Sequence, residues 1–242
     1  MRRAGVCSGM RVLDVGCGVG DVSLLAARLV GADGAVLGFD RSKSSIDTAR
    51  RRATALRAGN VNFTEADLVS FEPDRLYDAV VGRLVLLYVP DAATKVCRLS
   101  QFLRPGGVVA FQEIDMPQLA QAPESDLFRQ VKRWITQAFA AAGAEVEMGS
   151  KLYSTFLRAG LNRPNMISAA RVGCGPDSAA YKYLAGVVRS LAPVIERSNI
   201  ANLSDIDIDT LADRLRDDAV SHERVIFLPR MVGAWARIAE AV

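Results

Sequence analysis

The stretch Val12-Leu13-Asp14-Val15-Gly16-Cys17-Gly18-Val19-Gly20 carries the clearest structural signal in this chain. Its apolar first half predicts a buried strand, and the glycines at every second position predict a tight turn directly after it. Because glycine has no Cβ, such a turn lets the backbone approach a ligand closely. A dinucleotide-binding G-x-G-x-x-G motif would place its third glycine where this chain has Asp21. The spacing therefore argues against a nicotinamide-dependent oxidoreductase.

Four further segments follow this turn along the first half of the chain. Val36-Leu37-Gly38-Phe39-Asp40 is a second apolar strand that ends in a carboxylate, and Glu65-Ala66-Asp67-Leu68 carries two more acids. Tyr77–Gly82 predicts a further strand, and Leu103–Phe111 contains a Pro-Gly-Gly turn into another. In order and spacing, these segments resemble the motifs of the class I S-adenosylmethionine (SAM)-dependent methyltransferases. The later segment Gly233-Ala234-Trp235-Ala236-Arg237 is similar to the small-molecule branch near the ubiquinone and menaquinone biosynthesis methyltransferases.

The resemblance implies an α/β fold of the Rossmann-like class I methyltransferase type, with a mostly parallel seven-stranded sheet and helices on both faces. The alternation of strand and helix signals up to about residue 115 predicts the same arrangement. Beyond it, helical stripes predominate and predict a helical cap from late insertions. We therefore expect a single domain over 1–242, with a SAM-binding half at 1–115 and a helical cap with the final strands, on the substrate side, at 116–242.

Two later segments are the candidates for the last strands of this sheet. Asn165–Val172 predicts a sixth strand from its composition. Val232–Ile238 predicts the last strand, although its alanines leave a helix as an alternative.

The resemblance assigns contacts with SAM to the ends of the strands. Asp14 is expected to position the amino-acid end of the cofactor, and the glycine turn lets the backbone pass beside its methionine and ribose portions. Asp40 is expected to accept hydrogen bonds from both ribose hydroxyls, which is a charge-assisted pairing. Asp67 is expected to bind the adenine amino group and the backbone of Leu68 the ring edge. A strand-end cap is the alternative role for each acid alone. The residues predicted to bind the cofactor are Asp14, Gly16, Cys17, Gly18, Gly20, Asp40, Arg41, Asp67, Leu68 and Arg83.

Two of these residues are arginines that follow strands. Arg41 is expected to lay its aliphatic stem on the adenine, as arginine commonly does on flat rings. Arg83 is expected to reach the cofactor carboxylate or an acidic substrate, with a surface salt bridge as the alternative. The product of the reaction would be S-adenosyl-L-homocysteine.

Methyl transfer from a sulfonium is a displacement at an already activated carbon, so positioning and desolvation can supply much of the rate. A general base is needed only when the acceptor must lose a proton. Glu113 and Asp115 follow the predicted fifth strand, where such a base would lie, with loop capping as the alternative. His222, the only histidine, is a second catalytic candidate, although the sequence shows no positioned partner for it.

Composition limits the partners of the chain. Its four cysteines are scattered without CxxC pairs, which indicates a reducing cytoplasm and no metal site. The net charge of +3 is mild, and Arg50–Arg52 predict a solvated helix face, so no nucleic-acid partner is expected. No apolar run approaches the roughly 20 residues that cross a bilayer, and no signal-peptide core follows Arg2 and Arg3. The expected partner is a small-molecule substrate.

The chain departs from the family in two ways, which concern the identity of the methyl acceptor and the closure of the site over SAM. Gly82-Arg83-Leu84-Val85 lacks the Asn-Pro-Pro-Tyr type motif of relatives that methylate adenine or glutamine amino groups. The family also usually carries a longer segment before the glycine turn, whose helices close over SAM. We expect the late helices around Trp134 and Tyr181, or a second copy of the chain in a homodimer, to provide that closure.

Two hypotheses remain open at this point. The first is an enzyme of the EC 2.1.1 class that transfers a methyl group from SAM to oxygen, nitrogen or carbon of a small organic acceptor. The alternative is a non-catalytic protein of the same fold that binds the cofactor or a partner chain without turnover. Only a measurement of turnover separates them.

Overall fold

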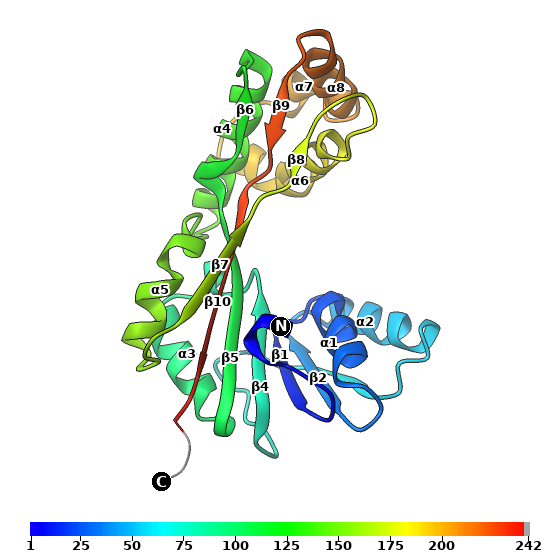
Figure 1. The fold of residues 1–242 in the computed structure, drawn as a ribbon. Coiled ribbons are helices and arrows are strands. Elements are labelled where there is room, and N and C mark those ends of the chain that lie inside the picture. Colours follow the sequence, from blue (N-terminus) through cyan, green and yellow to red (C-terminus); the bar gives the residue numbers. More distant parts are fainter. Residues whose placement is uncertain (240–242) are drawn as a thin grey trace. The chain divides into compact units, whose positions relative to one another are not determined.

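The computed structural model describes residues 1–239, whose elements are drawn in Figure 1. The strands are β1 (Arg11–Val15), β2 (Ala35–Asp40), β3 (Val61–Glu65), β4 (Tyr77–Arg83), β5 (Leu103–Asp115), β6 (Ala120–Ala122), β7 (Asn165–Ala169), β8 (Val172–Gly173), β9 (Val225–Phe227) and β10 (Arg230–Arg237). The α-helices are α1 (Asp21–Val30), α2 (Lys43–Ala55), α3 (Ala92–Ser100), α4 (Asp126–Ala141), α5 (Met148–Arg158), α6 (Ala180–Arg197), α7 (Leu203–Ile206) and α8 (Leu211–Ser221). Three short 3₁₀ helices are η1 (Arg2–Ala4), η2 (Leu86–Tyr88) and η3 (Met116–Gln118).

These elements form two compact units, each built from separate stretches of chain. The first unit holds Met1–Glu113, Lys151–Ile167 and the described residues from 233 to 239. The second unit holds Ile114–Ser150 and Ser168–Val232. The assignment of 1–115 to cofactor binding and 116–242 to a cap stays a prediction.

A seven-stranded sheet has the strand order β3-β2-β1-β4-β5-β10-β7. Its first five strands pair in parallel. β10 runs antiparallel to β5, because Ile238 donates to the carbonyl of Gly107 whereas Gly233 lies near the carbonyl of Phe111. The mostly parallel seven-stranded sheet predicted from the sequence is therefore confirmed.

Helices cover both faces of the parallel part of this sheet. On one face, Val12, Val36 and Val81 pack in a cluster with α1 and α2. On the other, the ring of Phe39 stacks on Phe71 with 4.2 Å between centroids. α3 belongs to this second face, because β4 and β5 extend the sheet in the direction opposite to β2 and β3 and the crossovers are right-handed.

The predicted sixth strand, Asn165–Val172, is wrong as a single element. Its first part is β7, the edge of the seven-stranded sheet, and its end is β8. β8 pairs antiparallel with β9, with Val172 opposite Phe227, in a separate three-stranded sheet of order β6-β9-β8. The division follows from this pairing with a distant segment, which composition does not reveal. The last strand is confirmed as β10, so the helical alternative there is excluded.

The core of the second unit lies along α6, which packs against α4, α7, α8 and β8. The apolar face of α6 is buried, with Leu184, Val188 and Ile195 each at most 1% exposed. Among residues 1–239 no helix combines the length and the apolar character needed to cross a bilayer.

Candidate functional site

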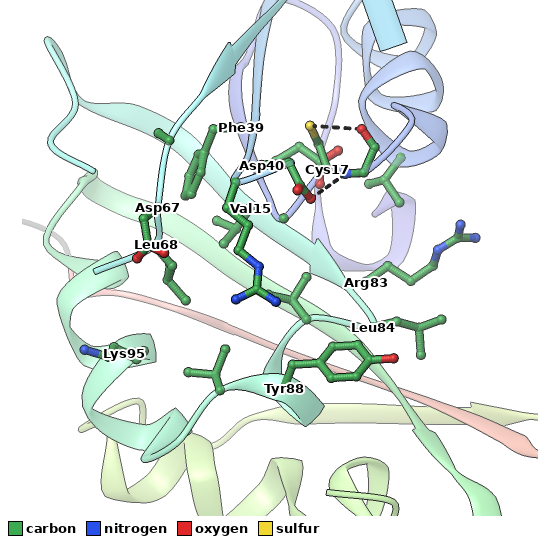
Figure 2. A pocket seen from close by; sticks show the side chains of 18 of the residues that line it. Val15, Cys17, Phe39, Asp40, Asp67, Leu68, Arg83, Leu84, Tyr88 and Lys95 are labelled. Atoms are coloured by element: carbon green, nitrogen blue, oxygen red, sulfur yellow. Dashed lines mark hydrogen bonds between the residues drawn. The ribbon is translucent and has the colours of Figure 1, made fainter. Parts of the chain in front are cut away.

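A cavity of about 570 Å³ lies at the carboxyl ends of β1, β2, β3 and β4 (Figure 2). From β1 the chain extends the sheet through β2 and β3, and then returns to extend it the other way through β4 and β5. Open α/β sheets bind ligands at such a switch point. All the residues that line the cavity belong to the first unit, and its volume is typical of small-molecule sites.

The glycine turn after β1 forms one side of the cavity, and all three glycines have left-handed φ angles. These are +59° at Gly16, +53° at Gly18 and +86° at Gly20. A Cβ on Gly16 would come within 2.8 Å of Val85, and one on Gly20 within 2.9 Å of Phe63. A Cβ on Gly18 would meet nothing within 4 Å. Packing therefore requires glycine at the first and third positions, whereas the middle glycine leaves open space in the lining of the cavity.

Asp40 is the last residue of β2 and connects the two neighbouring turns. Its Oδ2 accepts a hydrogen bond from the backbone N–H of Gly18 at 3.0 Å (Figure 2). Its Oδ1 accepts one from the backbone N–H of Ser42 at 2.8 Å. A carboxylate offers about four lone-pair sites, so two remain for a ligand in the cavity. Asp40 thus fixes the glycine turn and still presents acceptor capacity.

The loop after β3 brings Asp67 and Leu68 to the same cavity. The Oδ1 of Asp67 accepts from the backbone N–H of Val69 at 2.7 Å. From α3, the guanidinium of Arg98 donates to the carbonyls of Leu68 at 2.8 Å and Val69 at 2.6 Å. The sequence did not identify Arg98, because its target is backbone carbonyls 30 residues away, which leave no motif.

Arg83 lines the cavity and also forms the salt bridge weighed as its alternative. Its Nη2 lies 3.2 Å from Oδ2 of Asp21, whose other oxygen lies 2.7 Å from Nη2 of Arg52. Arg52 also donates to the carbonyl of Val19 at 2.6 Å. The arginines of α2 lie on an exposed face as predicted, and Arg52 additionally holds the end of the glycine turn. Arg41 lines the cavity, and no ion pair involves it among residues 1–239.

Asp14 forms part of the cavity lining and is only 1% exposed. The hydroxyl of Ser23 donates to its Oδ2, but burial dominates and raises the pKa of Asp14 to about 7. Burial likewise raises the pKa of the Cys17 thiol far above its usual range. Cys17 therefore stays a protonated packing group in the turn.

The buried carboxyl group of Asp14 predicts a pH-dependent stability. Its folded-state pKa of about 7 exceeds the ordinary value of 3.8, so protonation stabilises the folded form. This stabilisation is complete below about pH 4 and is lost as the pH rises through about 7. Between about pH 5 and pH 8 the wild type is expected to lose about 3 kcal/mol more than Asp14→Asn. Urea unfolding at both pH values measures this difference, and equal losses would contradict it.

Glu113 is fully buried and is absent from the cavity lining. Its Oε1 accepts from the backbone N–H groups of Val85 at 3.0 Å and Leu86 at 2.9 Å, and its Oε2 accepts from Leu87 at 3.4 Å. Burial nevertheless raises its pKa to about 7. The neighbouring candidate, Asp115, accepts hydrogen bonds from the N–H and hydroxyl of Ser150, at 2.8 Å and 2.6 Å. The role of Glu113 as a general base stays a prediction.

His222 follows α8 in the second unit, whereas the residues that line the cavity belong to the first. Its Nδ1 lies 2.9 Å from the carbonyl oxygen and 3.8 Å from Oδ1 of Asp218. Its side chain is 57% exposed. The catalytic role of His222 also stays a prediction. Within the described residues, no group of three or more His, Cys, Asp or Glu side chains is placed to hold a metal ion.

The connection between β4 and α3 supplies a cavity wall that the sequence did not predict. Leu84, Val85 and Tyr88 line the cavity from this connection, and Lys95 lines it from α3 (Figure 2). β4 ends at Arg83, and Leu84 adopts a left-handed φ of +57°. Leucine in this conformation has no sequence signature, because glycine and asparagine normally occupy it.

Comparison with known proteins gives one family and several partial relatives. A family model described as "Methyltransferase domain" matches residues 7–160. A 2-phytyl-1,4-naphtoquinone methyltransferase of Synechococcus elongatus is 36% identical over 143 residues, which cover 57% of this chain and 60% of that protein. A trans-aconitate 2-methyltransferase of Methylobacterium radiotolerans is 38% identical over 120 residues, 49% of this chain and 42% of that protein. The matches thus span less than two thirds of the length of these curated relatives.

The fold has counterparts among solved structures. The YcgJ protein of Bacillus subtilis has a TM-score of 0.63 at 17% sequence identity, and the match covers 99% of this chain and 96% of that chain. At this level of identity the similarity concerns the fold alone.

Proposed function

Because the chain belongs to the methyltransferase domain family whose model it matches, we propose that it binds SAM in the cavity and transfers the methyl group to a small organic acceptor. One observation carries the proposal. The glycine turn after β1, Asp40 at the end of β2 and Asp67 after β3 all line one cavity at the switch point of the sheet. These are the positions that the resemblance assigns to the methionine, ribose and adenine portions of the cofactor.

The side chains around the cavity fit the groups that SAM carries. Asp40 retains acceptor capacity for two ribose hydroxyls beyond its bonds to Gly18 and Ser42. Asp67 accepts from Val69 through Oδ1, so Oδ2 is available to an adenine amino group. The open side of Gly18 lets a ligand approach the backbone. Bound SAM would supply a methyl carbon activated by its sulfonium, and the residues around it would orient the two reactants.

The acceptor is proposed to be a small conjugated molecule that is methylated at carbon, oxygen or nitrogen. The wall formed by Leu84, Val85 and Tyr88 offers apolar and aromatic surface to such a molecule. The named acceptors of the relatives, a naphthoquinone and an unsaturated acid, are of this kind. The proposal includes a cytoplasmic location, no nucleic-acid or membrane partner, and closure by the late helices or by a second copy in a homodimer.

Cofactor selectivity is the first test. S-adenosyl-L-homocysteine is expected to bind with a dissociation constant in the micromolar range, corresponding to about −8 kcal/mol, and NAD is expected not to bind comparably. The physical reason is the spacing of Gly16, Gly18 and Gly20, which differs from that of a dinucleotide turn. Isothermal titration calorimetry with both ligands measures this directly. Equal affinities for the two would exclude the proposed cofactor.

Turnover separates the proposal from the alternative of a non-catalytic cofactor-binding protein. The assay follows transfer of a radiolabelled methyl group from SAM into reduced naphthoquinones, unsaturated acids, phenols and amines. Transfer to one class identifies the acceptor chemistry. Cofactor binding without transfer to any class would favour the non-catalytic alternative.

A further inference from the structure

The carboxylate of Glu113 binds three consecutive backbone N–H groups of a neighbouring connection. Its two oxygens accept from Val85, Leu86 and Leu87 at 3.0, 2.9 and 3.4 Å. The side chain comes from β5, whereas the three donors lie between β4 and α3. Removing a carboxylate from water is costly unless it is hydrogen-bonded, so a fully buried one indicates a specific structural requirement at this place.

In the part of the chain that the structure describes, these three N–H groups donate to no backbone carbonyl. They lie at the start of the short helix η2, where the first N–H groups have no partner within the helix. No side chain caps η2 from its own N-terminal residue, Val85. Glu113 therefore caps η2 from the adjacent strand. The geometry follows from the strand register, because Arg83 pairs with Gln112 and Leu84 donates to the carbonyl of Gln112 at 2.9 Å.

The segment that Glu113 holds is the cavity wall opposite the glycine turn. Leu84 and Tyr88 expose 37% and 54% of their surface and line the cavity. The side chain of Val85 lies 2.8 Å from the place that a Cβ on Gly16 would occupy. A displacement of η2 would thus move this wall away from the turn. No charged side chain contributes to the pKa shift of Glu113, and Tyr88 is the titratable group whose pKa responds to it.

We propose that Glu113 is a positioning residue, which holds the connection between β4 and α3 so that Val85 and Tyr88 form the cavity wall. This inference rests on the proposed function, because the wall would contact the cofactor or the acceptor. It replaces the role of general base, since the carboxylate lies on backbone amides and is absent from the cavity lining.

The first test is Glu113→Gln, which keeps the shape but turns one acceptor oxygen into an NH₂ group. The variant is expected to lose the bond to Leu87 and to weaken those to Val85 and Leu86. Amide hydrogen exchange of Val85–Leu87 should accelerate at least about tenfold, and the dissociation constant of S-adenosyl-L-homocysteine should rise about tenfold. Glu113→Asp keeps the charge but is one methylene shorter, and it should lie between the wild type and Glu113→Gln.

Asp78→Asn is the matched control. Asp78 lies at the opposite end of β4 and also holds a backbone N–H, that of Arg11, at 2.7 Å. The other oxygen of Asp78 pairs with Arg104 at 2.9 Å. This variant neutralises a carboxylate of the same strand without touching the wall, so exchange at Val85–Leu87 and ligand affinity should stay as in the wild type. Equal effects of Asp78→Asn and Glu113→Gln would mean that Glu113 contributes only to the overall stability of the protein, and this would overturn the proposal.

The two roles of Glu113 also differ in kinetics and pH dependence. A general base would lower kcat while leaving ligand affinity and amide exchange unchanged, and that result would overturn the positioning role. Asp14 also lines the cavity with a pKa of about 7, so the pH dependence is compared in the Asp14→Asn background. There, positioning predicts that the affinity for S-adenosyl-L-homocysteine tightens from about pH 6 to pH 8 as Glu113 ionises, and that adding Glu113→Gln removes this trend. If the wild type binds no S-adenosyl-L-homocysteine, the proposed function fails, whereas the exchange experiment still tests the capping.

Discussion

Replacement of Asp40 by alanine is expected to weaken the binding of S-adenosyl-L-homocysteine by about 100-fold. Two hydrogen bonds from ribose hydroxyls to a charged acceptor would disappear, at about 1.5 kcal/mol each. The bonds that Asp40 accepts from Gly18 and Ser42 would be lost as well, so the glycine turn would also be less rigid. Calorimetric titration measures the affinity, and circular dichroism verifies that the variant is folded.

Asp47→Ala provides the control for this experiment. Asp47 lies on α2 close in sequence to Asp40, but its carboxylate pairs with Lys43 and Arg50 on the surface. Its removal changes the net charge equally and should leave the affinity unchanged. If a folded Asp40→Ala variant bound the ligand within about threefold of the wild type, Asp40 would not be part of the site.

Gly16→Ala is expected to reduce mainly the stability of the protein, whereas Gly18→Ala is expected to reduce mainly its affinity for the ligand. Both alanines would adopt a left-handed φ, which costs about 1–2 kcal/mol. Only the Cβ at position 16 would also collide with Val85, which adds about 1–3 kcal/mol. Gly16→Ala should therefore lose more stability, whereas Gly18→Ala should remain folded and lose ligand affinity at least about tenfold, because its methyl group would project into open space in the cavity.

A second substitution makes this comparison decisive. Val85→Ala removes the methyl groups that a Cβ on Gly16 would meet. In the Gly16→Ala background it should recover part of the lost stability, and in the Gly18→Ala background it should recover none. Urea unfolding of the three single variants, the two double variants and the wild type gives the coupling. Identical losses for the two glycine variants would contradict the distinct roles assigned to them.

The parts of the site that the sequence predicted depend on local backbone geometry. Gly16, Gly18 and Gly20 are needed for their φ angles, whereas Asp40 ends β2 and Asp67 lies two residues after β3. Such features are encoded within a few residues of one another. The alternation of strands and helices in the first half of the chain likewise predicted that most strands of the sheet run parallel.

The parts that the sequence missed depend on registers between distant segments. Glu113 reaches the amides of Val85–Leu87 only because β5 pairs with β4 at Arg83 and Gln112. The left-handed Leu84 is held by the same pairing. Local propensity contains no information on such a register, so the sequence offered capping as an alternative role for Glu113 but could not identify the amides that its carboxylate binds.

The strand order of the seven-stranded sheet has a consequence for the synthesis of the chain. Every cavity-lining residue lies between Asp14 and Lys95, so this part of the chain leaves the ribosome before β5 and β10 do. β10, the partner of β5 on its far side, ends only at Arg237. Until then the 13-residue β5 presents an unpaired edge, and such edges recruit other chains.

A nascent chain of this protein thus carries a nearly complete ligand site on an incomplete sheet. Domains generally begin to fold as they emerge, and incomplete intermediates with open edges aggregate. Translation at about 5–20 residues per second leaves β5 exposed for several seconds before β10 arrives. During this interval the partly synthesised protein is expected to bind chaperones, and the yield of soluble product is expected to depend on the speed at which the codons between β5 and β10 are translated.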